Sequence, residues 1–374
     1  MVWDFIFGGL FLLGLVGLII LINGVRQLPF VAALAHGSKA AGFGIGAIVV
    51  LVPAALLWIA WGYMNVIVIV LHLTVFWGIA ALVRRIVQKC RRQPLRHNRT
   101  VAVAVLATVV YLGVGWAQAH HVWQTDYTVT TDKPVGTLRV ALLADAHVGT
   151  TFNGDGFARH VARIQEQQPD IVVIAGDFVD EDTSKEDMIA ACRALQSLIT
   201  PHGVYYVFGN HDKGKYSNCQ RGYTGDDLAA ELQKNGVTVL QDEQVLIDNR
   251  FYLIGRQDAS EEVDFGGSRA SIADLAHPLD DDKFSIVLDH QPRDYAAETA
   301  VGVDLVLSGH THGGQMIPLM QFMRWFHLSS DNNIYGAERH DRTDFIVTSG
   351  ISDWAVKFKT GCRSEFVIVD IQER

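Results

Sequence analysis

Residues 170–180 read DIVVIAGDFVD, and this stretch decides the fold. Asp170 is followed by five apolar residues without interruption, which is typical of a strand buried on both faces of a sheet. Gly176 and Asp177 come next, so a carboxylate stands where the strand should end. Open α/β sheets bind their ligands at the carboxyl ends of their strands. The stretch therefore predicts an α/β sheet with a polar site at that edge.

The same arrangement, a strand-like run that leads into a polar cluster, recurs four more times along the chain. The runs and clusters are 138–143 before Asp145 and His147, 204–208 before Gly209, Asn210, His211 and Asp212, 284–288 before His290, and 303–307 before Gly309, His310, Thr311 and His312. The first pair is two residues apart, so its side chains share a face if the chain is extended there. We expect all five clusters to meet at one edge of the fold.

The residue types in these clusters suit the hydrolysis of a phosphate ester. Two divalent cations roughly 3.5–4 Å apart can neutralise phosphoryl oxygens and turn bound water into a nucleophile near neutral pH. Carboxylate, amide and imidazole ligands without thiolates fit Mn, Fe, Zn or Mg. Any one cluster alone could be ordinary turn chemistry. Five in series indicate a site for two divalent metal ions, whose identity the residues leave open.

From about Leu138 to the C-terminus the chain resembles the calcineurin-like metallophosphoesterase superfamily. More narrowly, it resembles the membrane-anchored bacterial branch whose histidine motif continues as GHTHGGQ, here residues 309–315. The resemblance implies a four-layer αββα sandwich, an α/β fold, and attack on phosphorus by a metal-bridging hydroxide.

The resemblance also assigns roles to individual residues. It implies that one metal ion is bound by Asp145, His147, Asp177 and His312, and the second by Asp177, Asn210, His290 and His310. Asp177 would bridge the two ions. His211 would be catalytic, stabilising the transition state and protonating the leaving oxygen without binding metal. We interpret Asp180 and Asp212, which lie inside the motifs, as groups that orient the ligands.

The first 117 residues have the composition of a membrane region. Residues 40–83 contain no Asp, Glu, Lys or Arg, and a spanning helix needs about 20 apolar residues. We predict four spans at about 3–23, 41–61, 64–83 and 101–117, a linker at 118–136, and the metallophosphoesterase domain at 137–374. A signal peptide is the less favoured interpretation of the first span, because no basic residue precedes it.

The charge distribution predicts which side of the membrane the domain faces. Residues 84–99 carry seven Arg or Lys and no acid, so this loop should be cytoplasmic. The next span then leaves the cytoplasm, which predicts a multi-pass protein of the bacterial inner membrane with its domain on the periplasmic side. The chain has 40 acidic against 31 basic residues. Because the loops of the membrane region are basic, the excess of acidic residues lies in the domain. An acidic domain argues against nucleic acid as a partner.

The substrate follows less directly from the residues. Membrane anchoring favours a phosphodiester or pyrophosphate of a lipid or envelope substrate. The apolar stretch 317–328 suggests lipid contact through Phe322, Trp325 and Phe326, or packing inside the domain. Two alternatives remain open: a cytoplasmic enzyme resembling UDP-2,3-diacylglucosamine pyrophosphatase, and a non-catalytic metal-binding membrane sensor or scaffold. The oligomeric state and a pairing of Cys219 with Cys362 also stay open.

Overall fold

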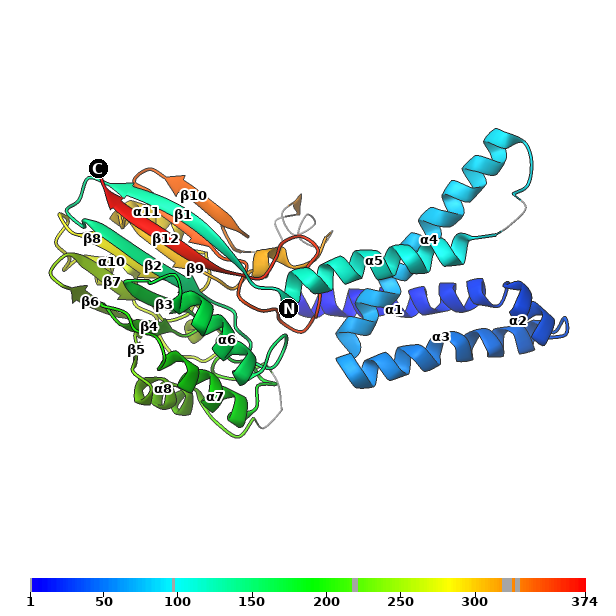
Figure 1. Ribbon diagram of the computed structural model, residues 1–374, viewed down its shortest axis with the longest axis horizontal. Helices are drawn as coiled ribbons and strands as arrows, with labels where there is room; N and C mark the ends of the chain where they lie inside the picture. The colour runs from blue at the N-terminus through cyan, green and yellow to red at the C-terminus, as the bar shows by residue number, and fades with distance from the viewer. Residues whose placement is uncertain (1, 96–97, 217–220, 318–324, 327–329) are drawn as a thin grey trace. The chain divides into compact units, whose positions relative to one another are not determined.

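The computed structural model describes residues 2–95, 98–216, 221–317, 325–326 and 330–374 (Figure 1). The chain divides into two compact units, Met1–Gly115 and Trp116–Arg374. The first is helical, and the second contains two sheets. The predicted fold class, an apolar four-helix region followed by a mixed α/β domain, is confirmed. The finer domain boundaries stay a prediction.

Within the described residues, four helices are long and apolar enough to cross a membrane. The helices before the sheets are α1 (Val2–Val25), the short α2 (Pro29–Leu34), α3 (Lys39–Trp61), α4 (Tyr63–Arg91) and α5 (Thr100–His120), of which all but α2 have this length and composition. Glycines let α1 approach α4 closely, because a Cβ on Gly24 would lie 2.5 Å from the Trp77 ring. Gly62, at φ +81, makes the tight turn between α3 and α4.

The second unit holds two six-stranded sheets. The first has the order β1 (Trp123–Thr131), β12 (Glu365–Glu373), β2 (Thr137–Leu143), β3 (Ile171–Ala175), β4 (Val204–Val207), β5 (Val237–Val239). The second has the order β10 (Gly336–His340), β11 (Thr343–Val347), β9 (Leu305–Ser308), β8 (Phe284–Leu288), β7 (Phe251–Gly255), β6 (Glu243–Ile247). Strands β2 to β5 run parallel, and so do β7, β8, β9 and β11. Parallel neighbours bring their carboxyl ends to one edge.

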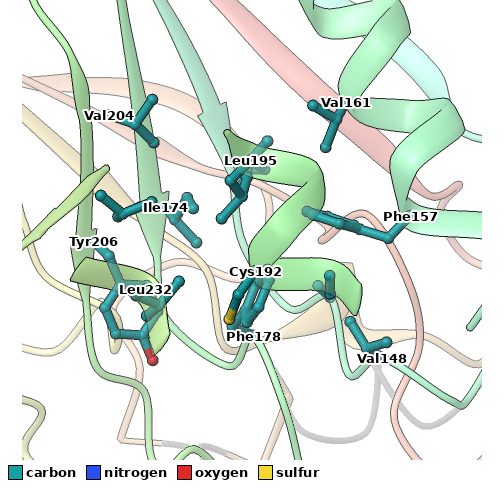
Figure 2. Close-up of a cluster of buried hydrophobic side chains, with 14 of the residues drawn as sticks. Val148, Phe157, Val161, Ile174, Phe178, Cys192, Leu195, Val204, Tyr206 and Leu232 are labelled. Atoms are coloured by element: carbon teal, nitrogen blue, oxygen red, sulfur yellow. The ribbon is translucent and has the colours of Figure 1, made fainter. Parts of the chain in front are cut away.

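Three apolar cores define four layers. One core joins the first sheet to α6 (Gly154–Gln165), α7 (Lys185–Leu195) and α8 (Gly225–Lys234), and Figure 2 shows part of it around Phe157, Phe178 and Tyr206. The second core, with Leu142, Phe251 and others, lies between the sheets. The third joins the second sheet to α10 (Ile272–Ala276) and α11 (Tyr295–Val301). Buried strands covered on both faces explain the uninterrupted apolar runs.

One strand lies inside the segment that the sequence predicts as a linker. Residues 123–131 form β1, which pairs in parallel with β12 from Trp123↔Glu365 to Thr131↔Glu373. This part of the segment is therefore not a free connection but an edge of the first sheet. Its partner strand is the last one in the chain, so no local pattern pointed to the pairing.

Candidate metal centre

The predicted ligands lie just beyond the strand ends, in strained backbone. Asp145, His147, Asp177, His310 and His312 all have positive φ, between 35° and 72°. Non-glycine residues rarely adopt this conformation, which costs of order 1–3 kcal/mol each and is concentrated at functional sites. Hydrogen bonds between neighbouring loops compensate for the strain, for example from Asp145 N to the Gly176 carbonyl at 3.0 Å.

Six of the seven predicted ligands form two groups whose ligand atoms converge. The groups are Asp145, His147 and His312, and Asp177, His290 and His310; within each, the ligand atoms all lie within 4.8 Å of one another. The His147 and His312 rings stack with their centroids 5.0 Å apart. The groups combine residues from both sheets, so the site sits where the two sheets present their carboxyl ends together.

Asp177 and Asn210 connect the two groups. Asp177 Oδ2 lies 3.7 Å from His147 Nε2 in one group and 3.1 Å from His290 Nε2 in the other. Asn210 Oδ1 lies 3.2 Å from His290 Nε2 and 2.8 Å from His310 Nδ1. The structure thus places the seventh predicted ligand with the second group, and Asp177 between both.

The donor set fits divalent cations. His290 Nδ1 donates to the Ala175 carbonyl at 2.7 Å, as metal-binding histidines commonly do with a backbone oxygen. Its Nε2 then faces the oxygens of Asp177 and Asn210, and a metal ion could bind all three atoms. His147 Nε2 and His312 Nδ1 are buried without a hydrogen-bond partner among the described residues. Orphaned imidazole nitrogens next to buried carboxylates are what a metal ion satisfies.

The pKa values of the residues in the centre also favour bound cations. Burial raises the pKa of Asp145 to about 6. Burial lowers the pKa of His310 to about 4 and that of His312 well below its usual value, so both imidazoles are neutral, as metal ligands must be. Burial also lowers the pKa of His290, but Asp177 outweighs it and holds that pKa well above its usual value. The carboxylates therefore create a field that strongly favours cations.

The comparisons with known proteins agree with this geometry. Residues 138–314 match the family model described as "Calcineurin-like phosphoesterase". A relative from Aquifex aeolicus named "Uncharacterized metallophosphoesterase" is 34% identical over 192 residues, covering 50% of this chain and 69% of the relative. The chain belongs to the calcineurin-like phosphoesterases. Members of this family use divalent metals, and the two ligand groups are the candidate sites for them here.

Other relatives extend the comparison to membrane proteins. A Campylobacter jejuni protein named "Uncharacterized metallophosphoesterase Cj0846" is 27% identical over 235 residues, 63% of this chain and 59% of that protein. A Bos taurus protein named "Transmembrane protein with metallophosphoesterase domain" is 30% identical over 254 residues, 62% of this chain and 53% of that protein. The chain spans about three fifths of the first curated relatives it matches. Its apolar helices and these relatives indicate membrane association.

In the phosphoesterase domain, Asp212 and Asp180 contact the ligands or their loops. The Asp212 carboxylate accepts hydrogen bonds from the backbone N–H groups of Asp177, Phe178, Val179 and Gly209, at 2.7–3.1 Å. This single side chain ties the Asp177 loop to the Asn210 loop. Asp180 Oδ2 lies 3.3 Å from His147 Nδ1, on the far side of that ring from Asp177.

Sequence reasoning missed Glu181. It is buried, and its Oε2 accepts a hydrogen bond from His211 Nδ1 at 2.9 Å, while its Oε1 accepts one from Tyr216 N at 3.1 Å. The bond fixes the orientation of the His211 ring. The only signal in the sequence was a second acid directly after Asp180, which is also common on a solvated loop.

A fully buried lysine also escaped prediction. Lys359 Nζ donates to the carbonyls of Ser349 at 2.6 Å and Ser352 at 2.9 Å, and it lies 3.2 Å from Asp353 Oδ1. Burial raises the pKa of Asp353 to about 6. The loop held in this way packs on the first ligand, since a Cβ on Gly350 would lie 2.7 Å from Asp145 Cβ. Lys359 thus stabilises the loop that packs against Asp145.

The residues predicted to contact lipid are only partly described. Phe322 lies outside the described residues, and so does Cys219. Trp325 and Phe326 are 72% and 62% exposed. Cys362 is a free thiol, and its Sγ donates to the His312 carbonyl at 3.1 Å. The described part of the stretch therefore presents aromatic surface, while the lipid contact itself stays a prediction.

Proposed function

We propose that the chain is a membrane-anchored, binuclear metal-dependent phosphoesterase. The observation that carries the proposal is the Asp177 carboxylate, which lies 3.7 Å from His147 Nε2 and 3.1 Å from His290 Nε2. One oxygen placed between two groups of imidazole and carboxylate ligands suits a ligand shared by two ions. We assign Asp145, His147, Asp177 and His312 to one ion, and Asp177, Asn210, His290 and His310 to the other. When bound, the ions neutralise the phosphoryl oxygens and lower the pKa of water.

The residues around the centre position the substrate and move a proton. Water supplies the oxygen that forms the new bond to phosphorus, and the bond from phosphorus to the leaving oxygen breaks. Glu181 holds His211 by Nδ1, so Nε2 is the nitrogen that donates a proton to the leaving oxygen. Asp212 keeps the Asp177 and Asn210 loops in register through four backbone hydrogen bonds. Positioned general acids contribute typically 10²–10⁴-fold to the rate.

The substrate that we propose is a phosphodiester or pyrophosphate of a lipid or envelope molecule. Its support is the four apolar helices and the exposed rings of Trp325 and Phe326. Replacing both rings, as Trp325→Ser and Phe326→Ser, should lower turnover of a lipid substrate in vesicles and spare a small soluble diester. An equal loss on both substrates would contradict the lipid contact. The cytoplasmic enzyme that resembles UDP-2,3-diacylglucosamine pyrophosphatase stays the alternative proposal.

We further propose that the domain faces the periplasm of a bacterial cell. The support is the basic segment 84–99, which begins in the last turns of α4 and precedes α5, because basic segments next to a span stay in the cytoplasm. Protease added to intact spheroplasts should digest the domain without permeabilisation. Digestion only after permeabilisation would place the domain inside and favour the cytoplasmic alternative.

The activity is tested with the full-length chain in detergent micelles, supplied with Mn²⁺ and bis-p-nitrophenyl phosphate. Wild-type protein should turn over the diester, and Asp177→Asn and His211→Ala should both lose most of that activity. Asp177→Asn should also lose bound metal, whereas His211→Ala should keep it. A folded wild-type protein that binds two ions and shows no turnover would support the sensor or scaffold alternative instead.

A further inference from the structure

His211 presents one edge of its ring to a substrate. Its Nδ1 is bound to Glu181, and the His147 ring lies on the metal side at a centroid distance of 5.2 Å. The leaving group of the proposed reaction must therefore sit against Nε2. The residues around that nitrogen decide which leaving groups bind well.

Two aromatic rings flank His211. The Tyr216 ring centroid lies 5.0 Å from that of His211, and the Trp354 ring centroid lies 5.3 Å from it. Tyr216 is 48% exposed, and Trp354 is partly exposed. They come from distant parts of the chain, one following β4 and the other between β11 and β12. Both rings are therefore close enough to His211 to contact a group bonded to the leaving oxygen.

Hydrogen bonds hold the Tyr216 ring and the backbone of Trp354 in place. Tyr216 donates from its backbone N to Glu181 Oε1 at 3.1 Å and from its hydroxyl to Asp264 Oδ2 at 2.8 Å. The Trp354 carbonyl accepts from Gln315 Nε2 at 3.3 Å, and Gln315 follows the ligand His312 in the chain. A ring fixed like that of Tyr216 loses little freedom on binding, which favours affinity.

The charged groups beside Tyr216 form ion pairs with one another. Lys215 Nζ lies 3.7 Å from Asp264 Oδ1, and Lys213 is ion-paired with Glu261. Their charges largely cancel, so what this side offers a leaving group is the aromatic surface. Aromatic faces bind other flat or apolar faces and add about 0.5–1.5 kcal/mol beyond area burial.

From this arrangement we propose a leaving-group subsite that selects an uncharged ring, either a cyclic polyol or an aryl group, against Tyr216 and Trp354. The proposal rests on the proposed function, because His211 defines the leaving side only if it protonates the leaving oxygen. It adds to that function the chemical class of the group released. For an amphiphilic substrate, the ring is the headgroup and the phosphate stays with the other half.

The test uses three soluble glycerol phosphodiesters and the full-length chain with Mn²⁺ in detergent micelles. The esters carry inositol, benzyl alcohol or a second glycerol. We expect kcat/KM to be about two- to tenfold higher for the ring-bearing esters than for the open-chain one, with the ring alcohol released and glycerol phosphate retained. A higher kcat/KM for the inositol ester would assign the subsite to a cyclic polyol, and a higher kcat/KM for the benzyl ester would assign it to an aryl group. Equal kcat/KM for all three, or release of glycerol from the ring esters, would overturn the subsite.

Variants separate this subsite from the proposed function. Trp354→Leu and Tyr216→Leu keep apolar volume but remove the rings, so each should bring the ratio between ring and open-chain esters toward one, mainly through KM. Tyr216→Phe keeps the ring and should keep the ratio. Tyr252→Leu, on β7, is the matched control and should leave the ratio unchanged. A wild-type protein inactive on every diester overturns the proposed function and the subsite with it; an active one whose ratio survives both Leu variants overturns the subsite alone.

Discussion

Two buried charged clusters lie close together in the chain and are stabilised in different ways. The metal-ligand cluster comprises Asp145, His147, Asp177, Asn210, His290, His310 and His312. The arginine cluster comprises Arg256, Arg269, Asp289, Asp294 and Glu298, and its Asp289 directly precedes His290. Arg256 Nη1 lies 2.7 Å from Asp289 Oδ2 and 2.9 Å from Asp294 Oδ2, and Arg269 bonds to the same Asp289 oxygen.

The difference is the source of the positive charge. In the arginine cluster the protein supplies its own permanent cations, because arginine stays protonated. In the metal-ligand cluster the bases are histidines: burial lowers the pKa of His310 and His312, whereas neighbouring carboxylates outweigh burial and raise the pKa of His147 and His290. Buried carboxylates need a compensating cation. A protonated histidine can release its proton and bind a metal ion, whereas arginine cannot, so only the histidine cluster can take up metal ions from outside.

The largest effect should come from breaking the arginine cluster. Arg256→Met leaves Asp289 buried with one partner fewer and should lower the free energy of unfolding by about 3–5 kcal/mol, as removal of one buried ion-pair partner typically does. Chemical denaturation of the full-length variant measures this. The folded fraction should still bind two metal ions. Loss of metal binding without loss of stability would contradict the separation of the two clusters.

Metal removal should act on the other cluster. A chelator should abolish turnover and lower Tm, because ions that bind only the folded state stabilise it by about 2.7 kcal/mol at a hundred times their Kd. Restoring Mn²⁺ should reverse both effects. Arg256→Met should show the same metal-dependent difference in Tm as wild-type protein. A Tm independent of metal in wild-type protein would show that the ligand cluster is compensated internally after all.

Glu181→Gln should have an intermediate effect on catalysis. Glutamine keeps the shape but not the charge that orients His211, so kcat should fall roughly 10–100-fold, as it does for other supporting partners of active-site histidines. The loss should be greater for an alkyl than for a p-nitrophenyl leaving group, since only the former needs the proton. Metal content should not change. Equal losses on both esters would contradict the assignment of His211 as the acid.

The smallest effect, a pH dependence, concerns Glu298. Burial, together with the charge of Asp289, raises the pKa of Glu298 well above its usual value. The folded protein therefore keeps this proton to a higher pH than the unfolded chain, and stability falls as pH rises through that interval. Glu298→Gln has no proton to lose. The Tm of the variant relative to wild-type protein should rise with pH, and a difference that shrinks with pH would contradict the raised pKa.

Much of the centre could be predicted because its signals are local. An apolar run followed by an acid, as in 170–180, marks a strand and its ligand within eleven residues. Glu181 and Lys359 could not be predicted in this way. The partner of Glu181 lies 30 residues further on, at His211, and Lys359 is buried only because backbone carbonyls of its own loop surround it. A lysine without such carbonyls belongs at the surface.

The chain's amino-acid order determined which residues are available as metal ligands, which runs become buried strands and which helices are long enough for a membrane. These properties depend on side-chain chemistry and periodicity, and both are readable over a few residues. Only the tertiary structure decided that Asp177 lies between two ligand groups, that Glu181 holds His211, and that Tyr216 and Trp354 flank it. Those contacts join residues from loops far apart in the chain, and their distances follow from how the cores pack the two sheets together.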